Sequence, residues 1–367
     1  MNKESDFMRT IVGAAVQAPS GGNNQPWSFH CDGEVLYVVN DRSRASSPTL
    51  DVGERATYAA LGAAVENAVI AAAAAGRLAR VQWLPDPNNP RIAARLDFTD
   101  GDPAALAADA ALYPQVNERL TNRRTSTPRA LPADQIAALR AAAELRGGQL
   151  SLCHDPKQLD VLAEILGVSD GIRMFSAALH GEMMGELRFT KKETDESRDG
   201  IDLATLELSG GQRRVIRMMR RFSVARFMGK LGAGKAFIAG AKQMLATSSA
   251  FAVVSVPGHG LADYLQGGRA MQRVWLTATS LGVVFQPLAA VTYLFMRVRF
   301  FNSEGFDPAT AHTLQSLLDR FDHIFPEIGR DRGHVLYFRL GYAERASARS
   351  LRRPVDAVLH KGPPPAV

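Results

Sequence analysis

The feature that most constrains this sequence is a pair of glycine-bounded, alanine-rich segments separated by an offset of 206 residues. The first runs from Gly62 to Gly76 and the second from Gly268 to Gly282. Both begin with small residues, continue with apolar residues at helical spacing and end on glycine. This pattern predicts two helices whose backbones can approach a neighbour closely.

The stretches that flank the two segments also correspond. A predicted strand or hairpin precedes each of them, "SFHC–DG–EVLYVV" in the first half and "GQLSLC" in the second. A strand-like apolar run follows each of them, "RLARVQWLP" and "VVFQPLAAV". Two alanine-rich helices can align by chance, but the matching flanks favour duplication of one α+β unit.

The composition is that of a globular chain, because 46% of the 367 residues are hydrophobic and 22% are charged. This length suits one large or two ordinary domains. The net charge of +6 suits anionic small molecules, such as phosphorylated cofactors, as well as nucleic acid. The sequence has neither an RNP-type aromatic pattern nor a helix-turn-helix signature, so we expect no nucleic-acid partner.

Cysteine and histidine usage bears on metals and location. Cys31 and Cys153 form no CxxC motif and the histidines do not cluster at metal-ligand spacing, so we expect neither a metal site nor a disulfide framework. This pattern predicts a reducing, cytoplasmic location. The N-terminus lacks the layout of a signal peptide, and no apolar run reaches the roughly 18 residues of a membrane span.

The stretch "APSGGNNQPW", Ala18–Trp27, separates a helix-like run from a strand-like one. Such a cluster is common in turns. It also resembles the A-P-S-x-x-N-x-Q-P-W loop of the nitroreductase family of flavin enzymes. Residues 265–291 resemble the central helix of that family and the loop after it, and residues 340–360 resemble its C-terminal strand and arm.

The resemblance covers most of the chain in pieces, outside about residues 165–245. It implies an α+β fold of two fused nitroreductase-like units, with antiparallel or mixed sheets flanked by helices, that form an intramolecular pseudo-dimer like the Acg-type double-domain relatives. We expect an N-terminal half at 1–115 and a C-terminal half at 116–367 with a lid inserted at about 165–245. The chain would be a pseudo-dimeric monomer or a homodimer.

The resemblance implies FMN as the cofactor. The family's R-x-S-x-R/K phosphate motif is absent from the N-terminus, but Arg119, Thr121 and Arg123 supply R-x-T-x-R where the second half begins. The second half in turn lacks a copy of the Ala18–Trp27 loop. Each half has therefore kept what the other lost, and this predicts one FMN per chain.

Three groups of residues match family positions around the flavin. One set is expected to bind the FMN phosphate. It consists of Arg119, Arg123 and one of two arginines on the C-terminal arm, because guanidinium groups bind phosphate through paired charged hydrogen bonds. In the family, the N5 edge of the flavin ring faces a loop that usually has an acidic residue followed by glycine. This chain has two alanines at those positions. The predicted cofactor residues are Pro19, Ser20, Gly21, Asn23, Arg119, Thr121, Arg123, Pro287, Leu288, Ala289, Arg352 and Arg353.

The extra segment predicts a lid over the flavin. His180, Glu182 and Arg188 lie at helical spacing there, and they could line the pocket and supply a proton or bind a carboxylate; an exposed helix face is the alternative. The basic residues 213–242 fit a lid helix with an apolar underside, or a membrane-surface helix. A P-loop at Gly229–Ala236 is disfavoured, since Ala236 replaces the required Ser or Thr.

The resemblance implies an FMN-dependent oxidoreductase. Hydride would pass through flavin N5 between NADPH or NADH and a small electron-poor or biosynthetic substrate. The alternative is a protein that binds and sequesters FMN with little or no turnover, an alternative that the missing acidic residue at Ala289 favours.

Overall fold

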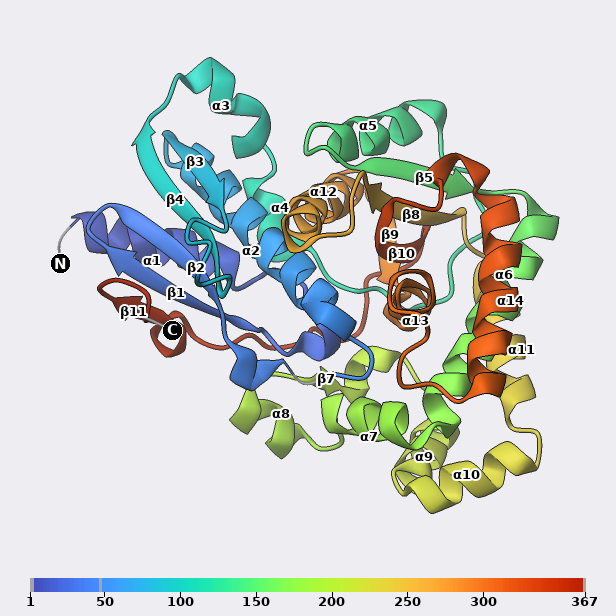
Figure 1. Cartoon of the computed structure of the whole chain (residues 1–367). Helices are drawn as coiled ribbons and strands as arrows, with labels where there is room; N and C mark the ends of the chain where they lie inside the picture. Colours follow the sequence, from blue (N-terminus) through green and yellow to red (C-terminus); the bar gives the residue numbers. More distant parts are fainter. Residues whose placement is uncertain (1–2, 46–47, 366–367) are drawn as a thin grey trace.

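The computed structural model describes residues 3–45 and 48–365 (Figure 1). The elements of the N-terminal part are α1 (Lys3–Ala15), η1 (Gly21–Asn23), β1 (Trp27–Asp32), β2 (Val35–Asn40), η2 (Arg42–Arg44), η3 (Val52–Glu54), α2 (Arg55–Ala74), β3 (Arg77–Trp83), β4 (Ile92–Asp100), α3 (Pro103–Ala110) and α4 (Tyr113–Glu118). Those of the C-terminal part are α5 (Ala133–Glu144), β5 (Gln149–Cys153), β8 (Ala250–Val256), α12 (Leu261–Ser280), β9 (Val284–Pro287), α13 (Ala289–Phe300), α14 (Pro308–Ile324), η5 (Pro326–Ile328), β10 (Gly333–Gly341), η6 (Val355–Ala357) and β11 (Leu359–Lys361). A helical insertion between β5 and β8 holds α6 (Pro156–Phe175), α7 (Ala177–Glu186), β6 (Leu187–Arg188), α8 (Lys191–Ser197), β7 (Ile201–Asp202), η4 (Leu203–Leu206), α9 (Gly210–Met219), α10 (Phe222–Lys230) and α11 (Gly234–Ala246).

The two halves share one sheet topology. The strands of the first sheet lie in the order β11-β1-β2-β4-β3, and those of the second in the order β5-β8-β10-β9. Matching β1 to β5, β2 to β8, β3 to β9 and β4 to β10 makes the two orders identical, apart from the added β11. In each unit the long helix, α2 or α12, lies between the second and third strands. The predicted α+β class and the two-unit pseudo-dimer are therefore confirmed.

The crossing of α2 and α12 shows why glycine recurs in the repeat. A Cβ atom added to Gly62 would lie 1.9 Å from the carbonyl oxygen of Leu265, and one added to Gly268 would lie 2.0 Å from that of Ala59. The 206-residue offset maps Ala59 onto Leu265 and Gly62 onto Gly268. Each contact is thus the mate of the other, as in the interface of a two-fold symmetric dimer.

A buried polar layer follows the same symmetry one turn further along. Glu66 pairs with Arg273 at 2.9 Å, and Gln272 donates to Asn67 at 2.7 Å. The offset exchanges these two pairs. Each polar side chain in the layer thus has a partner, which a buried polar group requires.

Helix α2 has the length and composition of a membrane span, since a window within Val52–Ala74 is apolar enough. However, 94% of that window is buried inside the protein. Its contact with α12 and with the sheet of the first unit accounts for its apolar character.

Each unit sends an arm across to the other. After α4 the chain runs to the second unit, where Asn122 donates its backbone N–H to Phe285 and Thr127 bridges Tyr342. After β10 the chain returns to the first unit, where β11 pairs in parallel with β1. The segments 119–123 and 349–353 therefore both lie between the two units.

The insertion starts directly after β5; α6 and α11 lie against the second unit, and α7, α8 and β7 run below the first unit (Figure 1). Helix α6 packs against α11, α13 and α14. The insertion also has a small core of its own, which consists of Met174, Met184, Leu187, Phe189, Leu203, Met219 and Ala225. A second excursion, α13 and α14 between β9 and β10, was not predicted; the run "VVFQPLAAV" is a strand only to Pro287, and helix α13 begins at Ala289.

Candidate functional site

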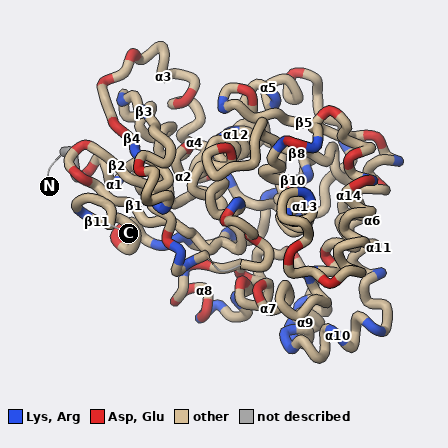
Figure 2. Tube along the Cα trace, viewed as in Figure 1, with Lys and Arg blue, Asp and Glu red and all other residues tan. Residues whose placement is uncertain are grey.

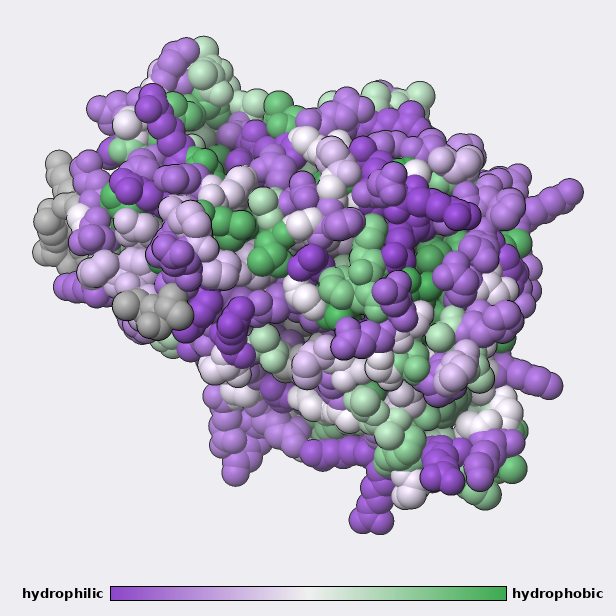
Figure 3. Space-filling model, viewed as in Figure 1, coloured by the Kyte–Doolittle hydropathy of each residue, from purple (hydrophilic) through white to green (hydrophobic). Residues whose placement is uncertain are grey.

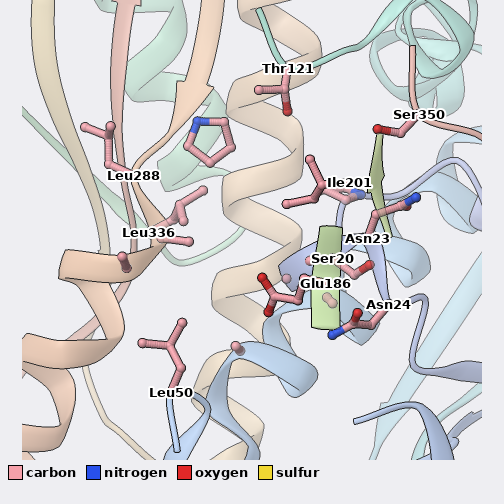
Figure 4. A pocket seen from close by; sticks show the side chains of 18 of the residues that line it. Ser20, Asn23, Asn24, Leu50, Thr121, Glu186, Ile201, Leu288, Leu336 and Ser350 are labelled. Carbon is pink, nitrogen blue, oxygen red and sulfur yellow. The ribbon is translucent and has the colours of Figure 1, made fainter. Parts of the chain in front are cut away.

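A cavity of about 460 Å³ lies between the two units and the insertion, and we call it the inter-unit cavity. Its size is in the range of small-molecule and cofactor sites. Figure 4 shows Ser20, Asn23 and Asn24 of the first unit across the cavity from Leu288 and Leu336 of the second. Both units thus contribute to a single site.

Eleven of the twelve predicted cofactor residues line this cavity. They are Pro19, Ser20, Gly21, Asn23, Arg119, Thr121, Arg123, Pro287, Leu288, Ala289 and Arg352. The twelfth, Arg353, does not line it. The backbone N–H of Arg353 donates to the side chain of Gln25, and its guanidinium group donates to the carbonyl of Ala357.

The inter-unit cavity is strongly cationic. Arg119, Arg123, Arg349 and Arg352 all line it, and within the described ranges none of them forms an ion pair with a carboxylate. Arg119 is 3% exposed, Arg123 and Arg352 are half-buried, and Arg349 is exposed. The Nε atoms of Arg119 and Arg352 are buried without a hydrogen-bond partner. A phosphate group would supply the negative charge that such buried guanidinium groups bind.

The electrostatics of the cluster agree with this. Burial lowers the pKa of Arg123 to about 10. Burial, together with the nearby charge of Arg349, lowers the pKa of Arg352 to about 10. Burial lowers the pKa of Arg119 well below its ordinary value, and the charges of Arg352 and Arg349 add to the effect. The protein thus holds Arg119, Arg349 and Arg352 close together at an energetic cost.

Arg349 and Ser350 line the cavity but were missed from the sequence. They belong to the arm whose resemblance singled out Arg352 and Arg353. Arg349 and Arg352 are three positions apart and line the same cavity. The sequence gives no signal for this arrangement of the arm.

The loop after α1 has a constrained backbone. Gly22, Asn23 and Gln25 all have φ between 55° and 57°, in the left-handed region. Two non-glycine residues held there indicate a loop fixed by its surroundings. A Cβ atom on Gly22 would lie 2.6 Å from the carboxyl carbon of Glu186, so only glycine fits against the insertion.

The Asn23 side chain ties three segments together. Its amide nitrogen donates to the carbonyls of Gly200, at 2.9 Å, and Leu351, at 3.1 Å. Its amide oxygen accepts from Arg352 at 2.8 Å. Asn23 therefore positions the arm and its arginine, in addition to lining the cavity.

Gln25 lies in the same loop and was not predicted as a site residue. Its backbone N–H donates to Ser20 Oγ at 2.9 Å, and its side chain donates to Arg198 and accepts from Arg353. The loop is therefore clamped between the insertion and the C-terminal arm.

Replacing Asn23 with alanine is expected to destabilise the protein by about 2 kcal/mol, because several buried hydrogen bonds are lost. The same change should weaken flavin retention, since it frees Arg352. Urea unfolding and flavin release on dialysis measure the two effects. Asn88→Ala, in an exposed turn, is the control and should change neither; equal behaviour of the two variants would contradict the role given to Asn23.

The N-terminus of α13 forms the wall opposite the loop. Leu288, Ala289, Ala290 and Val291 line the cavity there. The backbone N–H of Leu288 donates to Tyr337 at 2.7 Å, and no side chain caps the helix at that position. The first N–H groups of the helix, from Ala289 on, have no acceptor inside it, and they carry the positive end of its dipole.

Helix α6 of the insertion presents one face to the cavity, formed by Leu166, Asp170, Arg173 and Met174. Arg173 pairs with Glu186 at 2.8 Å. Asp170 forms no ion pair in the described part of the chain. Its side chain is exposed towards the cavity, and desolvation raises its pKa to about 6 despite the charge of Arg173. Sequence analysis missed Asp170, which only the fold brings to this wall.

Asp170→Asn is expected to stabilise the flavin-free protein by about 1 kcal/mol at pH 8, a value that allows for screening by water in the cavity. The pKa of Asp170 rises from its ordinary 3.8 to about 6 on folding. Its contribution to stability is therefore fully present below pH 3.8 and is lost as the pH rises through 6. Urea unfolding at several pH values should show the variant's advantage fading towards pH 4, and a constant advantage would contradict it.

The three lid candidates do not line the cavity, which corrects that part of the prediction. Buried His180 contacts the carbonyl of Met219 through Nε2 at 2.8 Å. Glu182 accepts the backbone N–H groups of Thr49 and Leu50.

Arg188 pairs with Asp199 at 2.6 Å, and Asp199 also pairs with Arg44. All three candidates therefore fasten the insertion to itself or to the first unit. The helical spacing of these three residues could not show whether their side chains form such structural hydrogen bonds and ion pairs or line the pocket.

Comparisons with known proteins point to one group. No family model matches the chain. An uncharacterized protein of Mycobacterium tuberculosis is 34% identical over 352 residues, which are 95% of this chain and 47% of that protein. The "Putative NAD(P)H nitroreductase acg" of the same species is 28% identical over 193 residues, which are 49% of this chain and 53% of that protein. The chain thus spans about half the length of the curated relatives that it matches.

Among solved structures, the FMN-dependent nitroreductase NfnB of Mycobacterium smegmatis, in complex with NADPH, is 15% identical with a TM-score of 0.35. It covers 65% of this chain and 89% of its own. The resemblance to nitroreductases of the Acg type, which the motifs predicted, is confirmed by the sequence matches.

Proposed function

We propose that this chain is an FMN-dependent oxidoreductase that uses NADH or NADPH. The observation that carries the proposal is the set of four arginines that line the inter-unit cavity and form no ion pair with any carboxylate of the described residues. The sequence matches to proteins named as NAD(P)H nitroreductases support it. A cavity with this charge fits a flat cofactor that ends in a phosphate.

The residues around the cavity fit FMN by their chemistry. Arg119, Arg123, Arg349 and Arg352 would hold the phosphate, and the hydroxyl groups of Thr121 and Ser350 would complete its hydrogen bonds. The loop at 20–24 and the start of α13 would flank the polar edge of the ring. Bound there, FMN would supply a hydride acceptor and donor.

The insertion would shape access for the substrate. Leu166, Met174, Met183, Met184 and Ile216 make its wall largely apolar, with Asp170 as a carboxylate facing the cavity. Such a wall favours a small, flat, electron-poor substrate over a large polar one. Apolar walls also exclude water from the site.

The pseudo-two-fold axis relates the inter-unit cavity to an equivalent position elsewhere between the two units. The residues at that position support a single flavin per chain. The offset maps Ala60 and Ala289, which line the cavity, onto Gln266 and Trp83. Trp83 donates to Gln266 at 3.1 Å, and Gln266 donates to the carbonyl of Arg146 at 2.7 Å. Larger side chains bonded to one another thus replace small ones there.

We further infer that the two units arose by duplication, with the boundary near residues 115 and 116, and that the chain acts in the cytoplasm as a pseudo-dimeric monomer or a homodimer. The shared strand order and the reciprocal glycine contacts support duplication. Chromatography with light scattering measures the mass, which would equal that of one chain or of two.

An anaerobic titration tests the proposed activity. The purified protein, reconstituted with FMN if needed, is treated with NADH and then NADPH while the flavin absorbance is followed. We expect one of the two to bleach the flavin, and a quinone or nitroaromatic compound to restore the colour. Bleaching by dithionite alone would contradict the oxidoreductase and favour the flavin-sequestering alternative. A protein that never takes up FMN would reject both.

A further inference from the structure

Exposed apolar side chains gather at the outer edge of the insertion. Six large hydrophobic residues of the described chain are exposed, and four of them lie on α9, on α10 or directly after α10. Their exposed fractions are 47% for Val215, 64% for Met218, 60% for Phe227 and 66% for Leu231. Figure 3 shows apolar surface beside polar surface in this region.

The same helices are basic throughout. The stretch from Ser209 to Lys242 contains no Asp or Glu and nine basic residues, which are Arg213, Arg214, Arg217, Arg220, Arg221, Arg226, Lys230, Lys235 and Lys242. Figure 2 shows the positive charge around α9 and α10. Lys242 pairs with Asp160, and Arg220 stacks on Phe189.

Apolar and cationic side chains alternate on one face of α10. Phe227 and Leu231 are four positions apart, as are Arg226 and Lys230, so both pairs share the outer face of the helix while Ala225 is buried. Helices that lie in a membrane interface combine these two features, because the rings and alkyl groups insert while the long cationic side chains reach the headgroups.

We propose that α9 and α10 form a peripheral docking surface for an anionic phospholipid bilayer. The positive charge of the surface is complementary to anionic headgroups. The four apolar side chains can insert into a bilayer, whereas a nucleic acid offers them no apolar environment. Docking does not depend on bound flavin.

The docking surface and the roof of the cavity belong to the same helix. Ile216 of α9 lines the cavity, whereas its neighbour Val215 and nearby Met218 face outwards. Docking through α9 would therefore bring the cavity to the lipid surface. If the proposed oxidoreductase function holds, a membrane-soluble electron acceptor would be concentrated there.

Sedimentation of the full chain with vesicles tests the proposal. We expect binding to vesicles that contain phosphatidylglycerol, much weaker binding to pure phosphatidylcholine, and loss of binding at high salt. The double variant Phe227→Ser/Leu231→Ser should bind about tenfold more weakly or less. Leu145→Ser is its control, because Leu145 is also exposed, at 57%, but lies directly after α5.

Charge variants complete the test. Arg226→Gln/Lys230→Gln should lose binding as well, whereas Lys191→Gln/Lys192→Gln on α8 should keep it. Thermal unfolding checks that all variants are folded. Equal binding by the α10 variants and their controls overturns the proposal. So does a preference for duplex DNA that is insensitive to Phe227→Ser/Leu231→Ser, since it would identify a nucleic-acid surface.

Discussion

Gly268→Ala is expected to destabilise the protein by about 3 kcal/mol or more. The added Cβ would lie 2.0 Å from the carbonyl oxygen of Ala59, and a backbone atom inside a packed helix cannot move aside cheaply. The helices α2 and α12 would have to separate, which opens the core shared by the two units. Gly62→Ala should behave in the same way, because the contact of Gly62 with Leu265 is related by the pseudo-two-fold symmetry to the contact of Gly268 with Ala59.

Urea unfolding of the purified variants measures this effect. The matched control is Gly240→Ala, which lies inside α11 with nothing within 4 Å of the added Cβ. That change should stabilise the protein by about 0.5–1 kcal/mol, because alanine favours the helix. If Gly268→Ala proves as harmless as Gly240→Ala, the two units do not meet at this crossing.

Arg119→Met is expected to have opposite effects on stability and on flavin binding. The variant removes a buried cation that pairs with no carboxylate among the described residues, so the flavin-free protein should become more stable by about 1 kcal/mol, after allowance for the lost stacking on Trp275. FMN affinity should fall about 10–100-fold, because a charged hydrogen bond to phosphate is lost.

Fluorescence titration with FMN and urea unfolding give the two readouts. Arg345→Met is the control, because Arg345 lies on the C-terminal arm, is 74% exposed and pairs with Glu118. It should change neither quantity by much. Unaltered FMN affinity in Arg119→Met would show that the arginine cluster is not the phosphate site.

Local patterns were sufficient to predict the main elements. The two glycine-bounded helices were expected at 62–76 and 268–282, and α2 and α12 include most of these residues. The hairpin with its Asp-Gly turn was correct, since β1 and β2 pair there. These signals are encoded within a few residues of each other, so the sequence carries them directly.

Other features depend on contacts between distant segments. Asn23 acquires its role from Gly200 and Leu351, which are 177 and 328 residues away. The excursion α13–α14 was missed because a short apolar run fits a strand or a buried helix equally well.

The functional side of the insertion was also beyond the sequence. The helical spacing of His180, Glu182 and Arg188 is the same whether that face lines a pocket, is exposed to solvent or is tethered to another segment. Asp170 lies on a face that only the packing of α6 against α13 turns towards the cavity. Which side chains meet a cavity is decided by that packing, and no local pattern records it.

The central claim is that the two units build one flavin site between them. The most direct measurement is the amount of FMN per chain after saturation and removal of the excess, from flavin absorbance and protein mass. We predict one FMN per chain. Two per chain, or none after attempted reconstitution, would contradict the account.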